Sequence, residues 1–256
     1  MIVSGPCGGP ENSNLLNLNF TILFKKSMSR FYGYILLALL LVGCSTEPEQ
    51  QASKTGNPED KKAQEMAEKK NILFFGNSLT AGYGLEDPQH AFPALIQKKI
   101  DSLGLPYKVI NAGLSGETTA GGKNRIDWLL RQKVDVFVLE LGANDGLRGI
   151  PVAETEKNLQ AIVDKVRAKY PDAKQLLLGM EVPPNLGNQY VNDFRAIFRR
   201  VAARNNMGFV PFLLEGVAGN TTLNLGDGIH PTAKGYEIVA ENVWPELLKL
   251  LEKDPV

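Results

Sequence analysis

Three side chains that could together perform acyl transfer, a serine, a histidine and an aspartate, occur in short polar segments of this sequence. Ser78 lies in the segment FFGNSLTAGYG, where an apolar run gives way to glycine-rich chain. His230 follows Asp227 by three residues in the segment DGIHP. A serine hydroxyl is a poor nucleophile until a base takes its proton, and an imidazole oriented by a carboxylate is such a base. Ser78, Asp227 and His230 are therefore candidates for a catalytic triad.

Acyl transfer also requires hydrogen-bond donors for the charge that develops on the tetrahedral intermediate. The Ser78 amide, a glycine amide in the segment AGLSGET and the Asn144 carboxamide are candidates. Each motif has a simpler interpretation when taken alone. Asn144 and Asp145 could form an Asx-turn, and Gly116 could serve only as a residue with positive φ. The segments that contain Ser78 and Asp227 could likewise be ordinary turns.

The chain around these motifs predicts alternating strands and helices. Strands are expected at Ile72–Phe75, Tyr107–Asn111, Val134–Leu141, Gln175–Met180 and Gly208–Phe212. Helices are expected at Phe92–Ser102, Thr118–Arg131, Val152–Lys169, Gln189–Asn205 and Thr232–Leu251. The run VDVFVLEL is almost continuously apolar, as in a strand that is covered on both faces. Strand–helix alternation of this kind predicts one α/β domain with a parallel sheet between helices.

Ligands of such sheets bind outside the carboxyl ends of the strands. Ser78 follows the first predicted strand, Gly116 the second and Asn144 the third, while Asp227 and His230 end a longer loop after the fifth. All these candidates are therefore expected at one edge of the sheet.

Position alone leaves two candidates for the base, because both histidines of the chain follow an aspartate by three residues. His90 lies deep within the first connection between strands, where it could also be a capping or surface residue. We favour His230 because it follows the last strand. Pro231 suits the first turn of the next helix, where its missing N–H is no loss.

Composition and missing motifs exclude several other classes of function. The chain has 256 residues, zero formal net charge and no basic patch, so nothing indicates a nucleic-acid partner. Neither clustered cysteines nor paired histidines suggest a metal, and no P-loop or complete G-x-G-x-x-G follows a strand. The nucleophile elbow G-x-S-x-G is also absent around Ser78.

The first seventy residues are typical of a targeting segment and a tether. From Met28 the sequence MSRFYGYILLALLLVGC has a basic residue, an apolar run too short to span a bilayer and small residues before Cys44. The end of this run resembles the lipobox of bacterial lipoproteins, which implies that Cys44 is diacylated and anchors the protein to a membrane outside the cytoplasm. A buried apolar segment with a free cysteine is the alternative. Both cysteines, Cys7 and Cys44, precede the predicted fold, so no disulfide framework is expected.

These features divide the chain into three parts. Residues 1–43 are expected to be a leader in which translation starts at Met28. Residues 44–70 are polar and highly charged, and are expected to form a lipidated disordered tether. Residues 71–256 are expected to form the catalytic domain.

Four motifs together resemble the SGNH (GDSL-type) hydrolase family, which is named for its serine, glycine, asparagine and histidine blocks. The motifs are Gly76-Asn77-Ser78-Leu79, Ser115-Gly116-Glu117-Thr118, Gly142-Ala143-Asn144-Asp145 and Asp227-Gly228-Ile229-His230-Pro231. The resemblance covers Asn71 to Leu251. It implies a flavodoxin-like three-layer α/β/α fold with a five-stranded parallel sheet, no cofactor or metal, and hydrolysis of esters and thioesters through an acyl-serine.

The resemblance also assigns roles to individual residues. Ser78 becomes the nucleophile, with Asp227 and His230 completing the triad. The oxyanion hole would be formed by Ser78, Gly116 and Asn144. One residue departs from the pattern, since Asn77 occupies a position where the commonest block has aspartate. We expect another hydrogen-bonding arrangement to replace that of the aspartate, without loss of activity.

Two further segments resemble one branch of the family, the periplasmic multifunctional thioesterases, lysophospholipases and arylesterases. They are Gly146–Gly149 and Val182–Tyr190. Leu147, Leu186 and Tyr190 are candidates for the acyl-binding site, although they could equally be packing residues. The expected protein is thus a monomeric, membrane-anchored serine esterase that acts on small-molecule esters or thioesters. A carbohydrate O-deacetylase of the same fold and a non-catalytic lipoprotein that binds glycan or lipid are the alternatives.

Overall fold

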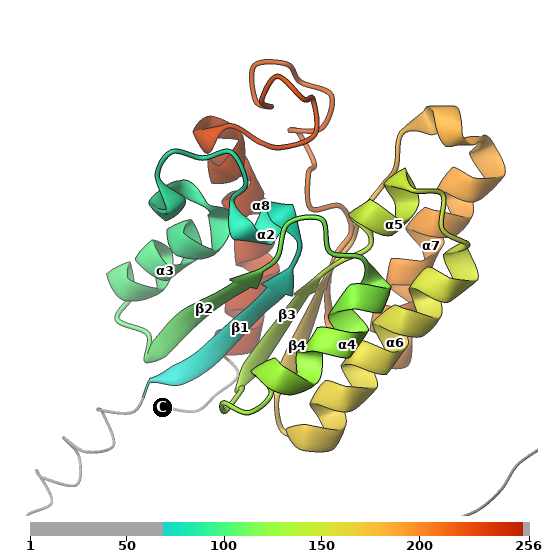
Figure 1. Ribbon diagram of the computed structural model, residues 1–256. Helices are drawn as coiled ribbons and strands as arrows, with labels where there is room; N and C mark the ends of the chain where they lie inside the picture. The colour runs from blue at the N-terminus through green and yellow to red at the C-terminus, as the bar shows by residue number, and fades with distance from the viewer. Residues whose placement is uncertain (1–68, 253–256) are drawn as a thin grey trace, which may run out of the picture. The chain divides into compact units, whose positions relative to one another are not determined.

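The computed structural model describes residues 69–252, which form one sheet flanked by helices (Figure 1). The strands are β1 (Lys70–Gly76), β2 (Tyr107–Gly113), β3 (Val136–Glu140), β4 (Lys174–Leu178) and β5 (Gly208–Val210). All neighbouring strands pair in parallel, in the order β2-β1-β3-β4-β5. This order is the flavodoxin-like one, so the predicted five-stranded parallel sheet is confirmed.

Helices connect the strands and cover both faces of the sheet. They are α2 (Ser78–Ala81), α3 (Phe92–Ser102), α4 (Thr119–Leu129), α5 (Ala143–Leu147), α6 (Val152–Lys169), α7 (Asn188–Arg204) and α8 (Ala233–Leu251), with the 3-10 helices η1 (Pro88–His90) and η2 (Pro184–Leu186). Helices α3 and α8 cover one face, and α4, α6 and α7 cover the other (Figure 1). The predicted three-layer α/β/α architecture is confirmed.

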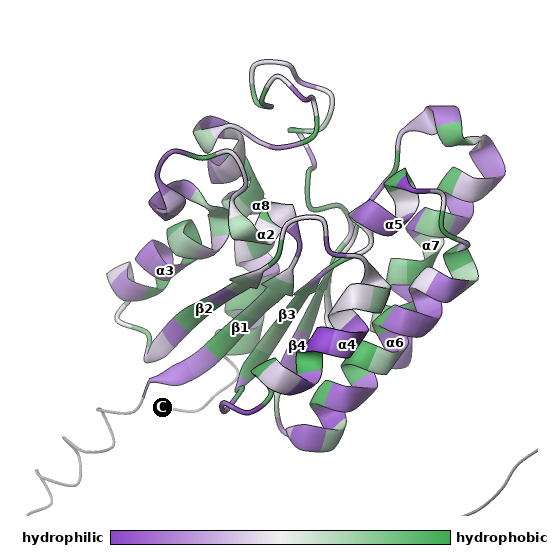
Figure 2. Ribbon diagram, in the orientation of Figure 1, coloured by the Kyte–Doolittle hydropathy of each residue, from purple (hydrophilic) through white to green (hydrophobic). Residues whose placement is uncertain are grey.

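Two consecutive phenylalanines of β1 show how the sheet is packed between its helix layers. The ring of Phe74 lies 5.6 Å from that of Phe92 in α3, in an edge-on arrangement. The ring of Phe75, pointing the opposite way, lies 4.5 Å from the guanidinium of Arg125 in α4. Successive residues of a strand face opposite sides of the sheet, so a strand covered on both faces must be apolar throughout. Figure 2 shows this pattern, with mainly hydrophobic strands between helices whose outer faces are hydrophilic.

Several predicted boundaries differ from the structure. Strand β1 begins at Lys70, one residue before the predicted start of the domain, and β3 begins at Val136 instead of Val134. Strand β5 ends at Val210, before Pro211, because proline has no N–H for the ladder. The short helices α2 and α5 occupy segments that the sequence predicted only as turns, because four or five residues are too few to show helical periodicity.

The targeting predictions concern residues that the structure does not describe. The leader, Cys44 and almost the whole predicted tether lie outside residues 69–252. Within those residues, none of the helices combines the length and the apolar character that crossing a bilayer would require.

Candidate active site

The candidate residues meet at the carboxyl ends of the central strands β1 and β3. Strands β1 and β3 are neighbours, but the chain continues from β1 to β2 on one side and from β3 to β4 on the other. The connections that follow such a strand pair leave in opposite directions, and a crevice for a ligand lies between them. Ser78 follows β1, Gly116 follows β2 and Asn144 follows β3.

Ser78 is the first residue of α2 and is 9% exposed. The helix begins there because the Asn77 side chain accepts a hydrogen bond from the amide of Leu79 at 2.9 Å, as an N-cap does. It ends at Gly82, whose φ of 79° lies in the left-handed region. The amides of the first helical turn have no acceptor within the helix, which leaves the Ser78 N–H available to a substrate oxygen.

The structure brings the three predicted triad residues into hydrogen-bonding contact. His230 Nε2 lies 2.8 Å from Ser78 Oγ, and His230 Nδ1 lies 2.6 Å from Asp227 Oδ2. With the proton on Nδ1, the imidazole donates to the carboxylate and Nε2 can accept the serine proton. His90, the other candidate for the base, is an exposed residue at the end of η1. The arrangement therefore favours His230.

Asp227 also organises the chain that carries the histidine. Its Oδ1 accepts hydrogen bonds from the amides of Ile229 at 2.8 Å and His230 at 3.0 Å, which is an Asx-turn. The hydrogen bonds from the His230 amide and imidazole lower the pKa of Asp227 to about 2. Asp227 thus forms a turn and also contacts the imidazole, and it stays ionised at neutral pH.

A segment we call the histidine loop, residues 223–232, places His230 opposite Ser78. Asn224 and Pro231 form an antiparallel bridge, and Leu225 N donates to His230 O at 2.7 Å. Helix α8 begins after this loop at Ala233, with the Thr232 side chain as its N-cap. Pro231 therefore precedes the helix, and its predicted place in the first helical turn is wrong, because Thr232 supplies the cap.

The glycine block forms a tight turn beside the serine. The amide of Glu117 donates to Leu114 O at 3.1 Å, and Gly116 has a φ of 79°, as expected at the third position of a type II turn. The positive-φ interpretation of Gly116 is therefore correct, and it is compatible with an amide directed at a substrate. Two side chains of the next loop fix this turn: Asn144 Nδ2 donates to Glu117 O at 3.0 Å, and Arg148 donates to Gly116 O at 3.1 Å.

Asn144 and Asp145 do not form the isolated Asx-turn that was one interpretation of their motif. Asn144 uses one amide hydrogen on Glu117 O, which leaves its second for a ligand. Asp145 is fully buried and accepts hydrogen bonds from the amide and the hydroxyl of Thr119 at the start of α4. Both side chains thus join the loop after β3 to the loop after β2, which fixes the two predicted oxyanion donors relative to each other.

Two supporting residues of the site were not predicted. Arg125 of α4 donates to the carboxylate of Glu117 and to Ala112 O, which anchors the glycine turn to the sheet. Glu140, the last residue of β3, lies beneath the serine and is 1% exposed. Burial raises the pKa of Glu140 to about 7. A signal for Glu140 was present, since it is a charged residue near the end of a largely apolar run.

The expectation about Asn77 agrees with the observed contacts. Its carboxamide Nδ2 donates to Glu140 Oε1 at 2.8 Å, while its Oδ1 caps α2. A carboxamide–carboxylate pair therefore occupies this position of the nucleophile block.

The three predicted acyl-site residues differ in their surroundings. Leu147 at the end of α5 is 44% exposed and Leu186 in η2 is 38% exposed. Tyr190 is more engaged, because its hydroxyl donates to Ile150 O at 2.8 Å and its ring stacks on Phe194. Their role in binding an acyl chain stays a prediction.

Exposed large apolar side chains are concentrated at this edge of the sheet. Of the seven in the described chain, five belong to segments that follow the carboxyl ends of strands: Tyr83, Leu114, Leu147, Leu186 and Ile229. The ring of Tyr83 lies 4.6 Å from that of His230. Apolar surface is thus exposed at the same edge of the sheet as the serine.

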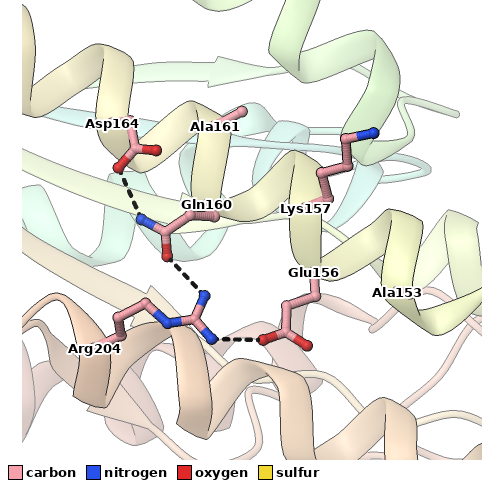
Figure 3. A pocket seen from close by; sticks show the side chains of 7 residues that line it. All are labelled: Ala153, Glu156, Lys157, Gln160, Ala161, Asp164 and Arg204. Atoms are coloured by element: carbon pink, nitrogen blue, oxygen red, sulfur yellow. Dashed lines mark hydrogen bonds and ion pairs between the residues drawn. The ribbon is translucent and has the colours of Figure 1, made fainter.

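A separate hollow lies between α6 and α7 (Figure 3). Its lining residues are Ala153, Glu156, Lys157, Gln160, Ala161, Asp164 and Arg204. Arg204 donates to Glu156 at 3.2 Å and to Gln160 at 3.4 Å, so these polar groups already satisfy one another. The hollow contains no residue of the triad. Across residues 69–252, moreover, no cluster of three or more His, Cys, Asp or Glu side chains could hold a metal ion.

Comparison with known proteins agrees with the geometry. Residues 74–238 match the model of the GDSL-like Lipase/Acylhydrolase family. The chain is 42% identical over 188 residues to Esterase TesA of Pseudomonas aeruginosa, which covers 73% of this chain and 92% of that protein. It is 35% identical over 184 residues to Thioesterase 1/protease 1/lysophospholipase L1 of Escherichia coli strain K12, covering 72% and 86% respectively.

A solved structure extends the likeness to three dimensions. The crystal structure of TesA has a TM-score of 0.68 and 42% identity to this chain, over 71% of this chain and 99% of that one. The family match spans every segment that contributes to the triad and to the glycine and asparagine loops. The chain therefore belongs to the GDSL-like Lipase/Acylhydrolase family and is an ester-hydrolysing serine hydrolase.

Proposed function

We propose that Ser78, His230 and Asp227 carry out the hydrolysis in two steps. Ser78 Oγ attacks the carbonyl carbon of an acyl ester or thioester while His230 Nε2 takes the hydroxyl proton. The tetrahedral intermediate collapses to an acyl-serine, and His230 gives its proton to the departing alcohol or thiol. Water then attacks the acyl-serine with His230 again as base, which releases the carboxylic acid and restores the serine hydroxyl.

The negative charge of each intermediate would be stabilised by the amides of Ser78 and Gly116 and the carboxamide of Asn144. The attachment of the Gly116 turn to Asn144 and Arg148 supports this role, because donors that are already fixed need no reorganisation during the reaction. Loss of the Asn144 carboxamide is expected to reduce kcat by about 10²–10³-fold.

The observation that carries the proposal is the 2.8 Å contact between His230 Nε2 and Ser78 Oγ. Replacing Ser78 by alanine should reduce hydrolysis of a p-nitrophenyl ester by about 10⁴-fold or more. It should also abolish labelling by a fluorophosphonate, with the label mapped by mass spectrometry to the peptide that contains Ser78. Ser102→Ala, at the exposed end of α3, is the control. Undiminished turnover or labelling of Ser78→Ala would exclude this residue as the nucleophile.

The exposed apolar side chains around the triad support a substrate with an apolar acyl chain. The ratio kcat/KM for p-nitrophenyl esters should therefore rise with chain length beyond acetyl. Leu147→Ser should lower kcat/KM for octanoate more than for acetate, by about 10-fold, because less apolar surface would cover the longer chain. An equal effect on both esters would remove Leu147 from the acyl site.

The same assays separate the alternative functions. An acetylated sugar hydrolysed faster than any aryl ester, lysophospholipid or acyl thioester would favour a carbohydrate O-deacetylase. Binding of a glycan or lipid without turnover of any of them would favour a non-catalytic lipoprotein. The relative of Escherichia coli named thioesterase and lysophospholipase supports testing those two substrates first.

Location and assembly are part of the same proposal. The lipobox-like segment before Cys44 supports a diacylated, extracytoplasmic protein held at a membrane, since two acyl chains make a stable anchor. Labelling with a radioactive fatty acid in a bacterial host should mark the chain and should be lost in Cys44→Ser. The domain is expected to be monomeric, which its elution in size-exclusion chromatography would test.

A further inference from the structure

A buried carboxylate that takes no part in the proposed chemistry lies directly beneath the nucleophile. Glu140 is the last residue of β3 and pairs with Gly76 at the end of β1. Its side chain accepts hydrogen bonds from the Asn77 amide at 3.0 Å, the Asn77 carboxamide at 2.8 Å and the Thr80 hydroxyl at 2.8 Å. All these contacts come from Asn77 and Thr80, which lie on either side of Ser78 in the chain.

Asn77 transmits this contact to the nucleophile. Its carboxamide nitrogen donates to Glu140, which fixes the orientation of the side chain, so that its oxygen faces α2. That oxygen accepts from the Leu79 amide at 2.9 Å and lies 3.4 Å from Ser78 Oγ. Without Glu140, the carboxamide could rotate away, and both the cap of α2 and the position of Ser78 would lose their support.

The surrounding residues leave room for the carboxylate and for little else. A Cβ on Gly76 would lie 2.5 Å from Glu140 Oε2 and 2.1 Å from Thr80 Oγ1. Asn77, Thr80 and Glu140 are each at most 1% exposed. A buried ionised carboxylate is unfavourable unless it is hydrogen-bonded, and here three donors from one short segment satisfy it.

We propose that Glu140 is a positioning residue that holds Ser78 in its reactive orientation through the carboxamide of Asn77. This inference rests on the proposed role of Ser78 as nucleophile. It adds a requirement that the triad alone does not contain, namely one carboxylate and one carboxamide at positions 77 and 140. The order of the two groups can be reversed, and this reversal provides the test.

The reversed pair, Asn77→Asp combined with Glu140→Gln, would keep every hydrogen bond of the original one. The oxygen of the introduced glutamine can accept from the amide of residue 77 and from Thr80, while its nitrogen donates to the introduced aspartate. That aspartate can still accept from the Leu79 amide. Each single variant breaks this complementarity. In Glu140→Gln, an amide N–H of the glutamine faces another hydrogen-bond donor. In Asn77→Asp, two carboxyl groups come into contact.

The single variants have different expected kinetics. Glu140→Gln should lower kcat by about 10–100-fold at pH 8, where the parental carboxyl group is ionised, while KM changes by less than about 3-fold, because misplacement of a nucleophile affects the reaction more than binding. Asn77→Asp should retain activity near pH 6–7, where the two carboxyl groups share a proton, and lose it as the pH rises and that proton leaves. Tyr236 of α8 also interacts electrostatically with Glu140, but burial raises the pKa of Tyr236, so it stays neutral in this range.

The reversed pair should recover kcat to within about 5-fold of the parent protein and should lack the alkaline loss of Asn77→Asp. Glu237→Gln, an exposed residue of α8, is the matched control and should leave kcat unchanged. A parental kcat for Glu140→Gln, or a reversed pair no faster than Glu140→Gln, would overturn the proposal.

Folding and the role of Ser78 can be separated from this result. If Glu140→Gln does not fold, Thr80→Val removes one donor to the same carboxylate and should lower kcat by about 3–10-fold with KM retained; an unchanged kcat there would overturn the proposal. If Ser78→Ala keeps its activity, the proposed nucleophile is wrong. If Ser78→Ala is inactive and Glu140→Gln is fully active, only the positioning role fails.

Discussion

Glu140 on the nucleophile side of the candidate site and Asp227 on the side of the histidine loop are carboxylates that are held in opposite ways. On the nucleophile side, Glu140 is buried beneath β1 and α2, and burial raises its pKa to about 7. On the side of the histidine loop, Asp227 is exposed, and the hydrogen bonds from His230 lower its pKa to about 2. Desolvation controls the first group and local hydrogen bonding the second.

This difference between the two carboxylates matches what the nucleophile side and the histidine loop must each do in the proposed reaction. The serine must be fixed in space, and its support comes from the middle of the sheet, where strands and packed side chains leave little freedom. The imidazole must change its charge during the reaction, so an ionised partner that solvent also reaches can stabilise the imidazolium form. Rigidity is thus concentrated on the nucleophile side, and permanent charge on the histidine loop.

The largest effect expected in this comparison is loss of the base. His230→Ala should lower kcat by about 10⁴-fold or more, since Ser78 would lose its proton acceptor. His90→Ala is the matched control, because it alters the other histidine of the chain, and it should change kcat by less than about 2-fold. Steady-state hydrolysis of a p-nitrophenyl ester measures both. Comparable losses in the two variants would contradict the assignment of the base.

Asp227→Asn should have the next largest effect, a loss of about 10³–10⁴-fold in kcat with the fold retained. The asparagine can still form the Asx-turn, but its amide group can impose the wrong tautomer on His230. The kinetics should be measured together with a circular dichroism melting curve. A stable variant with more than a tenth of the parental kcat would show that the carboxylate is not needed.

Two glycines test the contrast in rigidity. Gly76→Ala should destabilise the domain by about 3 kcal/mol, because its Cβ would clash with Thr80, with the Glu140 side chain and with the Glu140 carbonyl. Gly226→Ala in the histidine loop meets no atom within 4 Å and should stay within about 0.5 kcal/mol of the parent. Chemical denaturation of both variants gives the free energies of unfolding. Equal losses would mean that the two halves are packed alike.

The smallest expected effect is in the pH dependence of stability. The pKa of Glu140 is higher in the folded than in the unfolded chain, so its contribution to stability falls as the pH rises from about 4 to about 7. Relative to the parent, Glu140→Gln should therefore gain on the order of 2 kcal/mol in unfolding free energy between pH 5 and pH 8. Denaturation at the two pH values measures this. A difference between the two proteins that is independent of pH would contradict the raised pKa.

For Asp227, the contribution to stability should change with pH in the opposite direction and in a more acidic pH range. Its pKa is lower in the folded chain, so its stabilising contribution is complete above about pH 4 and is lost as the pH falls towards 2. Asp227→Asn should therefore differ from the parent in acid unfolding between about pH 4 and 2, and show no such trend between pH 5 and 8.

The fold could be predicted well because its signals are local. Helices α3 and α6 have their predicted bounds, and each of the five strands overlaps its predicted run, since apolar side chains and turn residues mark these segments directly. The short helices α2 and α5 could not be predicted in this way. Their formation depends on caps and on contacts such as that of Asp145 with Thr119, which lies 26 residues away.

The candidate site was predictable in its parts and not in its supports. Serine, glycine, asparagine and histidine motifs could be recognised because each follows a strand, and parallel strands end at the same edge. The sequence already favoured His230 over His90 from its place after the last strand, but only the structure places its imidazole against a hydroxyl 152 residues earlier. Glu140 was visible as a charged residue in a largely apolar run, but that run predicted only a buried strand and did not reveal the partners of the carboxylate.

By itself, the sequence determined the order of strands and helices and the set of polar residues available at the carboxyl edge of the sheet, because short-range patterns specify secondary structure and parallel topology orients it. Only the tertiary structure decided which of those residues touch and which carboxyl group is raised or lowered in pKa. The physical reason is that hydrogen-bond distance and desolvation depend on segments far apart in the chain, such as Asn77 and Glu140, which are separated by 63 positions.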